Sequence, residues 1–179
     1  MSHRTPKKPA GRIRQLRPSD QPRFRDHLMR LDPESRWDRF NGVTNDTFIT
    51  DYVDRSFHDG TTVIAYVEGD EVKGAAELHE RPEFDIPTGE IAFSVERDRQ
   101  GQGIGSKLFR RLLAHAHALG YERLLVTTHS DNRAMKALAR KFDAQLTFHI
   151  GETEGVIDLS PERALPVWRQ EILAATAAL

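Results

Sequence analysis

Residues 100–107 form a glycine-rich turn that reads Gln100-Gly101-Gln102-Gly103-Ile104-Gly105-Ser106-Lys107. The turn follows an apolar run at 91–95, which predicts a strand, and it precedes an apolar pattern at 108–113, which predicts a helix. A glycine-rich turn in this position leaves backbone N–H groups directed at one point near the positive end of the helix dipole. Such a turn is typical of a phosphate-binding site.

The spacing of the turn excludes two common phosphate sites. A dinucleotide fingerprint requires a third glycine three residues after the second, and after Gly103 that position holds Ser106. A Walker loop ends in Gly-Lys-Ser or Gly-Lys-Thr, whereas here Lys107 follows the serine. The pattern that remains is Gln-x-x-Gly-x-Gly, from Gln100, Gly103 and Gly105. Taken alone, it fits either a phosphate loop or an ordinary turn into a helix.

Composition narrows the class of protein. A chain of 179 residues, 38% hydrophobic and 30% charged, predicts one globular domain. A net charge of -1 gives no support to a nucleic-acid partner. Cysteine is absent, which excludes disulfides, a thiolate nucleophile and cysteine metal ligands. Neither a membrane span nor a signal peptide is evident, so we expect no membrane partner and a cytoplasmic location. Residues 1–12 are expected to form a disordered basic tail.

Apolar periodicity predicts an alternation of strands and helices. The segment Asp32-Pro33-Glu34-Ser35 is expected to break the first helix. Strands are expected at 13–17, 62–68, 71–78, 90–95, 123–128, 145–151 and 155–159, and helices at about 20–31, 47–57, 103–119, 132–142 and from 161 onward.

This order of elements, the loop and Asn132 together resemble the GNAT superfamily of N-acetyltransferases across residues 13–159. The resemblance implies an α/β (α+β) fold, with a mixed central sheet of about seven strands and flanking helices, in a single domain at 13–179 that includes the terminal helix. It also implies acetyl-CoA as co-substrate and no metal. Segments 31–40, 89–95 and 132–139 are similar, more narrowly, to the catalytic domain of bacterial protein lysine acetyltransferases.

The resemblance also implies roles for individual residues. Glu90 opens an otherwise apolar strand, so its carboxylate is expected in an apolar site, which tends to raise the pKa of a carboxylate as suits a base; the alternative is an exposed Glu at a strand end. The resemblance places Glu90 where the family has its general base, which takes the proton from the attacking ammonium directly or through water. Backbone amides near the strand end are expected to hold the pantetheine arm and the acyl carbonyl, which requires the strand to splay from its neighbour. Asn132 either contacts CoA or caps a helix, since asparagine favours the N-cap. The residues implied in CoA binding are Phe93, Ser94, Val95, Gln100, Gly101, Gln102, Gly103, Ile104, Gly105, Ser106 and Asn132.

Several questions stay open at this stage. Many family members use a tyrosine to protonate the departing thiolate, and that position is Ala139 here. Three alternatives stay open: water protonates the thiolate, the thiolate leaves unprotonated, or activity is lost. The acceptor is expected to be a protein lysine, with a small amine or a catalytically weak CoA sensor as alternatives. Loops 32–47 and 80–88 are expected to wall the acceptor site, with Trp37 and Phe40 in the core. The protein is expected to be a monomer or a homodimer, depending on what the apolar stripe of the terminal helix contacts.

Overall fold

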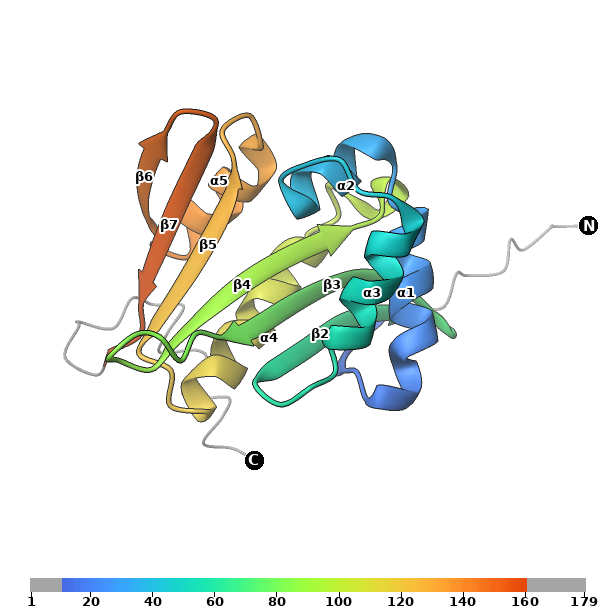
Figure 1. Ribbon diagram of the computed structural model, residues 1–179, viewed down its shortest axis with the longest axis horizontal. Coiled ribbons are helices and arrows are strands. Elements are labelled where there is room, and N and C mark those ends of the chain that lie inside the picture. Colours follow the sequence, from blue (N-terminus) through green and yellow to red (C-terminus); the bar gives the residue numbers. More distant parts are fainter. Residues whose placement is uncertain (1–10, 161–179) are drawn as a thin grey trace, which may run out of the picture.

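A computed structural model describes residues 11–160 of the chain, whose centre is a seven-stranded mixed sheet (Figure 1). The strand order is β1-β2-β3-β4-β5-β7-β6, and β4 and β5 form its parallel pair. The other neighbours are antiparallel. The strands are β1 (Arg12–Gln15), β2 (Thr61–Glu68), β3 (Glu71–Glu80), β4 (Thr88–Val95), β5 (Arg123–His129), β6 (Gln145–His149) and β7 (Glu152–Asp158).

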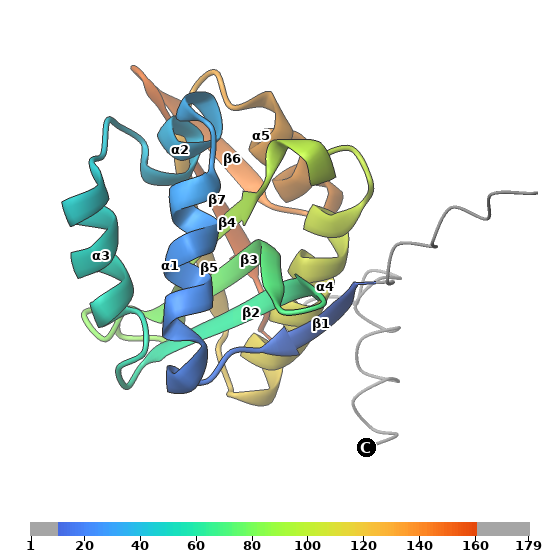
Figure 2. The ribbon, with the colours of Figure 1, turned by 90° about the vertical axis from the view of Figure 1, so that its right-hand side faces the viewer.

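Helices cover both faces of the sheet, and each face has its own hydrophobic core. The helices α1 (Gln21–Arg30), α2 (Pro33–Phe40) and α3 (Asp46–Arg55) lie on one face (Figure 2), and short 3-10 turns precede α1 and follow β4. On the other face lie α4 (Ile104–Ala118) and α5 (Arg133–Lys141). There Phe109 stacks between Phe93 and Phe142, with ring centroids 4.7 and 4.4 Å apart. The apolar stripe expected for the long helix is therefore the surface that α4 buries against the sheet.

The expected seven strands are confirmed, but the helix α2 was not expected. Asp32 does end α1, yet it also caps α2 by accepting a hydrogen bond from the Ser35 backbone at 3.1 Å. Pro33 then occupies the first turn, where its missing N–H costs nothing. This helix has only eight residues, with Trp37 and Phe40 as its large apolar side chains, and so short a pattern does not predict a helix.

The parallel pair β4–β5 is short, and this shapes the site. Only Thr88, Glu90 and the glycine between them pair with β5, and the last partner is Leu125. Beyond Glu90 the two strands diverge in a V (Figure 1). The splay that the family resemblance implied is therefore present.

Two expected features lie outside the described residues, namely most of the basic tail and the terminal helix from 161 onward. Across residues 11–160, we find no helix with the length and apolar character that crossing a bilayer requires.

Candidate active site

A cleft of about 660 Å³ opens at the end of β4. Its walls are the end of β4, the glycine-rich turn, the first turn of α4, the start of α5 and one side of α2. The sequence-predicted residues that line it are Phe93, Ser94, Val95, Gln100, Gly101, Gly103, Ile104, Gly105, Ser106 and Asn132. Gln102 is not part of the lining, because its side chain donates instead to the Asp98 carbonyl at 2.9 Å.

The glycine-rich turn has the backbone geometry of an anion site. Gly101 and Gly103 have φ angles of 72° and 76°, a left-handed conformation that favours glycine. The first turn of α4 closes with a hydrogen bond from the Lys107 backbone to Gly103 at 3.1 Å. The N–H groups of residues 104–106 therefore precede the helical ladder and lie at the positive end of the helix dipole.

Gln100 explains why the pattern begins with glutamine. Its side-chain amide donates to the Val95 carbonyl at 3.0 Å and to the Ser35 hydroxyl at 3.1 Å. One side chain thus connects the turn to the end of β4 and to α2, three segments that line the cleft.

The cations around the turn differ in their roles. Arg99 is buried and forms a two-point ion pair with Glu68 at 2.8 and 2.9 Å, which makes it structural. Lys107 is exposed, as a solvated surface residue would be. Lys141, at the end of α5, donates to the Ser106 hydroxyl at 3.0 Å. Sequence analysis missed Lys141, because it lies 35 residues from the turn and no local motif marks it.

Asn132 serves as the N-cap of α5. Its side-chain oxygen accepts from the Met135 backbone at 2.8 Å, and the residue, 8% exposed, also lines the cleft. The cap uses the oxygen, whereas a phosphate or carbonyl of CoA would use the amide N–H donors. The two roles expected for Asn132 are therefore chemically compatible.

Glu90 lies at the point where β4 and β5 part, outside the lining of the cleft. Its side chain is 32% exposed and forms an ion pair with Arg81, which also donates to Glu83 at 2.7 Å. The expectation of an apolar setting for this carboxylate was therefore wrong. The strand around it is apolar, but the loop between β3 and β4 brings a guanidinium over it.

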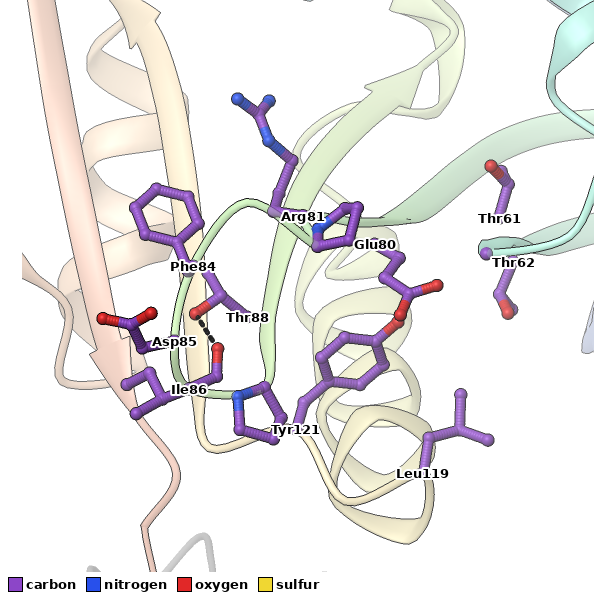
Figure 3. A pocket seen from close by; sticks show the side chains of 13 residues that line it. Thr61, Thr62, Glu80, Arg81, Phe84, Asp85, Ile86, Thr88, Leu119 and Tyr121 are labelled. Carbon is purple, nitrogen blue, oxygen red and sulfur yellow. Dashed lines mark hydrogen bonds between the residues drawn. The ribbon is translucent and has the colours of Figure 1, made fainter.

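A second cavity, of about 590 Å³, lies against that loop (Figure 3). Glu80, Phe84 and Tyr121 are among the residues that line it. Burial and the neighbouring charge of Glu80 raise the pKa of Tyr121. Arg81 belongs to the same lining, yet its guanidinium extends away from the cavity, so this residue connects the cavity to Glu90.

A buried polar cluster lies on the sheet beneath α2 and α3. The fully buried carboxylate of Glu77 accepts hydrogen bonds from Arg39 and Tyr52, each at 2.5 Å, and His79 contacts both Glu77 and Tyr52. Burial acts to raise the pKa of Glu77, but the charge of Arg39 and the hydrogen bonds hold it at about 2. Arg36, also on α2, pairs with Asp46. Each of the arginines 36, 39 and 81 therefore has an acidic partner in this part of the chain.

Other predicted residues take less central places. Phe40 packs against the core beneath α1 and α3, as expected, but Trp37 is 39% exposed and lies 5.9 Å from the ring of His129. Trp37 was expected in the core, and the outward position of α2 explains the error. Among residues 11–160, no group of histidines or acids could hold a metal. Ala139 is buried in the core beneath α4 and does not line the cleft.

Comparison with known proteins gives the family. The sequence model described as the acetyltransferase (GNAT) family matches residues 21–144, more than half of the chain. The chain therefore belongs to the GNAT family. It is an acetyl-CoA-dependent N-acetyltransferase, with acetyl-CoA as co-substrate.

Solved structures agree on the fold. The GNAT domain of PAT from S. lividans is 21% identical with a TM-score of 0.72, over 83% of this chain and 90% of that one. A putative acetyltransferase, yncA, from Salmonella typhimurium, solved with acetyl-CoA, is 21% identical with a TM-score of 0.65, over 88% and 99%. An acetyl transferase from Salmonella typhimurium, which modifies the N-terminal serine of ribosomal protein L7/L12, is 17% identical with a TM-score of 0.63, over 83% and 94%.

Proposed function

We propose that this acetyltransferase modifies lysine side chains of proteins, with Glu90 as the general base. The observation that carries the proposal is the place of Glu90, at the last paired residue before β4 and β5 diverge. From there β4 runs five residues to Val95, roughly 16 Å at the rise of a strand. An acyl-CoA whose pyrophosphate binds at the glycine-rich turn and whose arm follows β4 brings its thioester toward Glu90.

The donor end rests on charge and backbone geometry. The N–H groups of the first turn of α4 bind the pyrophosphate, the amide of Asn132 donates to the arm, and Lys141 adds positive charge beside Ser106. Along β4, backbone amides at 93–95 donate to the acyl carbonyl. An N–H directed at the developing oxyanion contributes about 3 kcal/mol to lowering the barrier.

The acceptor end rests on the ion pair between Arg81 and Glu90. In the free protein the guanidinium of Arg81 forms an ion pair with the carboxylate of Glu90. The acceptor arrives as an ammonium, another cation, and replaces Arg81 before Glu90 takes its proton directly or through water. The end of β3 and the loop that follows it carry Glu80, Glu83 and Asp85 beside this position, which favours a cationic acceptor over an acidic one.

The choice of lysine rests on the three segments at 31–40, 89–95 and 132–139, which resemble bacterial protein lysine acetyltransferases. The likeness to the GNAT domain of PAT supports the same choice at the level of the fold. An N-terminal amine is the principal competitor, since one structural neighbour modifies the N-terminal serine of L7/L12.

Two peptides decide between these acceptors. One carries a single lysine and a blocked N-terminus, and the other carries a free N-terminus and no lysine. Acetylation of the first alone is expected, and acetylation of the second alone would contradict the lysine assignment.

A pair of variants tests the base. Glu90→Gln is expected to lower kcat by about 10² to 10⁴ while leaving the Kd for acetyl-CoA unchanged. Glu83→Gln is the matched control, because Glu83 pairs with the same arginine but lies farther along the loop. Retention of full turnover by Glu90→Gln would exclude Glu90 as the base.

A further inference from the structure

Three residues whose side chains have no part in the proposed transfer chemistry form a connected series beside the cleft. The Nε2 atom of His27, on α1, lies 2.9 Å from the hydroxyl of Ser94, on β4. The Nδ1 atom of the same ring lies 3.2 Å from a carboxylate oxygen of Glu96. His27 is fully buried, and Ser94 and Glu96 are 6% and 7% exposed. Sequence analysis missed the series, because His27 lies 67 residues from Ser94.

The partners of Glu96 determine which nitrogen carries the proton. Arg30 and Lys73 bind its carboxylate at 2.8 and 3.1 Å, and with His27 they hold its pKa down to about 2, against the effect of burial. An ionised carboxylate only accepts hydrogen bonds, so Nδ1 of His27 is the donor to it. Burial lowers the pKa of His27, which leaves Nε2 unprotonated. The Ser94 hydroxyl therefore donates to Nε2.

This is the arrangement of a nucleophile, its base and an orienting acid, which is recognised by geometry rather than by fold. Ser94 also lines the cleft, between Phe93 and Val95, whose backbone amides are the proposed partners of the acyl carbonyl. We propose that Ser94 accepts the acyl group of acyl-CoA, with His27 as base, and that the protein is thereby an acyl-CoA hydrolase when no amine is present. The proposal rests on the CoA placement argued above, but not on Glu90 or the acceptor.

The chemistry balances with water as the second substrate. The Ser94 oxygen attacks the thioester carbon while its proton passes to Nε2 of His27, and the carbon–sulfur bond breaks. His27 returns that proton to the departing sulfur, so that CoA leaves as a thiol. Water from the cleft then attacks the serine ester, with His27 again taking and returning a proton. Acetate leaves, and the free hydroxyl of Ser94 is restored.

The same step supplies a proton for the departing sulfur. Ala139 stands where the family often has a tyrosine, and it is buried away from the cleft. Protonated His27 lies one hydrogen bond behind Ser94 and is formed at the moment the thiolate departs. The alternative is that the series only ties α1 to β4, a structural role that would produce neither an acyl-serine nor release of CoA without an amine.

The test omits the amine. The full-length protein is mixed with acetyl-CoA alone, released CoA is measured with a thiol reagent, and acid-quenched samples are digested for peptide mass mapping. We expect steady release of CoA and an acetyl group on Ser94. Ser94→Ala is expected to lower this release by about 100-fold or more, while calorimetry shows acetyl-CoA still bound.

Controls separate chemistry from folding. Ser56→Ala removes another buried hydroxyl, which donates to the Tyr52 carbonyl at 2.9 Å, and is expected to release CoA at the wild-type rate. Ser94→Cys keeps a nucleophile and is expected to retain a thioester adduct that hydroxylamine removes. Release by Ser94→Ala at the wild-type rate would overturn the proposal. So would a wild-type protein that binds acetyl-CoA but shows neither adduct nor release. Since no amine is present, either result leaves the Glu90 assignment to its own assay.

Discussion

Replacing Gly105 is expected to separate the stability of the fold from phosphate binding. Gly105 lies in the first turn of α4 and lacks the positive φ angle of Gly101 and Gly103. A Cβ added at Gly105 would meet only the Leu138 side chain, at an ordinary contact distance of 3.5 Å. Alanine is a better helix former than glycine, so Gly105→Ala is expected to stabilise the protein by up to about 1 kcal/mol.

Binding is expected to change in the opposite direction. Leu138 lines the cleft, so a side chain at Gly105 extends into the space where the pyrophosphate would approach the backbone. A hydrogen bond to a charged group contributes about 1.5–3 kcal/mol, and each 1.4 kcal/mol is a factor of ten. Loss of one phosphate contact in Gly105→Leu should therefore raise the Kd for acetyl-CoA by about 10- to 100-fold, with a smaller rise in Gly105→Ala.

Chemical denaturation and calorimetric titration with acetyl-CoA measure the two quantities separately. Gly103→Ala is the informative comparison, because a φ of 76° costs a non-glycine residue about 1–2 kcal/mol and its stability should fall together with affinity. A folded Gly105→Leu protein that binds acetyl-CoA with wild-type affinity would refute a phosphate site at this turn.

Three further predictions concern charges and caps. Arg81→Ala should lower the KM for the amine acceptor, because the acceptor ammonium no longer has to replace the guanidinium at Glu90; an unchanged KM would count against that contact. Glu77→Gln should cost about 3–5 kcal/mol, since it leaves buried Arg39 without its partner. Because folding holds the pKa of Glu77 below its ordinary 4.5, at about 2, its contribution is present above pH 4.5. That contribution, on the order of 3 kcal/mol, is lost as the pH falls through 2. Denaturation at several pH values should therefore show that the free energy of unfolding depends less on pH in Glu77→Gln than in the wild type. Asn132→Asp keeps a capping oxygen but removes the amide donors. Its free energy of unfolding should therefore be unchanged while the Kd for acetyl-CoA rises. An unchanged Kd would mean that Asn132 serves only as the helix cap.

Local chemistry made much of the fold predictable. Alternating apolar residues identified all seven strands, and the apolar stripe of α4 together with its preceding glycines identified the central helix and its turn. The sequence does not predict α2, because Asp32 and Pro33 are typical both of the end of one helix and of the start of the next. Trp37 was misplaced in the core for the same reason, since a side chain on an unrecognised helix has no assignable face.

The site was predictable only where its residues are close in sequence. Ten of the eleven residues expected to bind CoA line one cleft, because nine of these ten come from one strand–turn–helix segment. The surroundings of Glu90 were not predictable in this way. Its carboxylate meets Arg81 because the antiparallel pairing of β3 and β4 folds the connecting loop back over the strand.

By itself, the sequence determined the glycine-rich turn, the order of the elements and the family, since each depends on residue types at short, fixed spacings. Only the tertiary structure decided where β4 leaves β5, how Lys141 reaches Ser106, and that His27 stands behind Ser94. These contacts join residues 35 and 67 positions apart, or depend on the register between strands. No local pattern encodes such distances, because they follow from how whole faces of the sheet and helices bury their apolar surface.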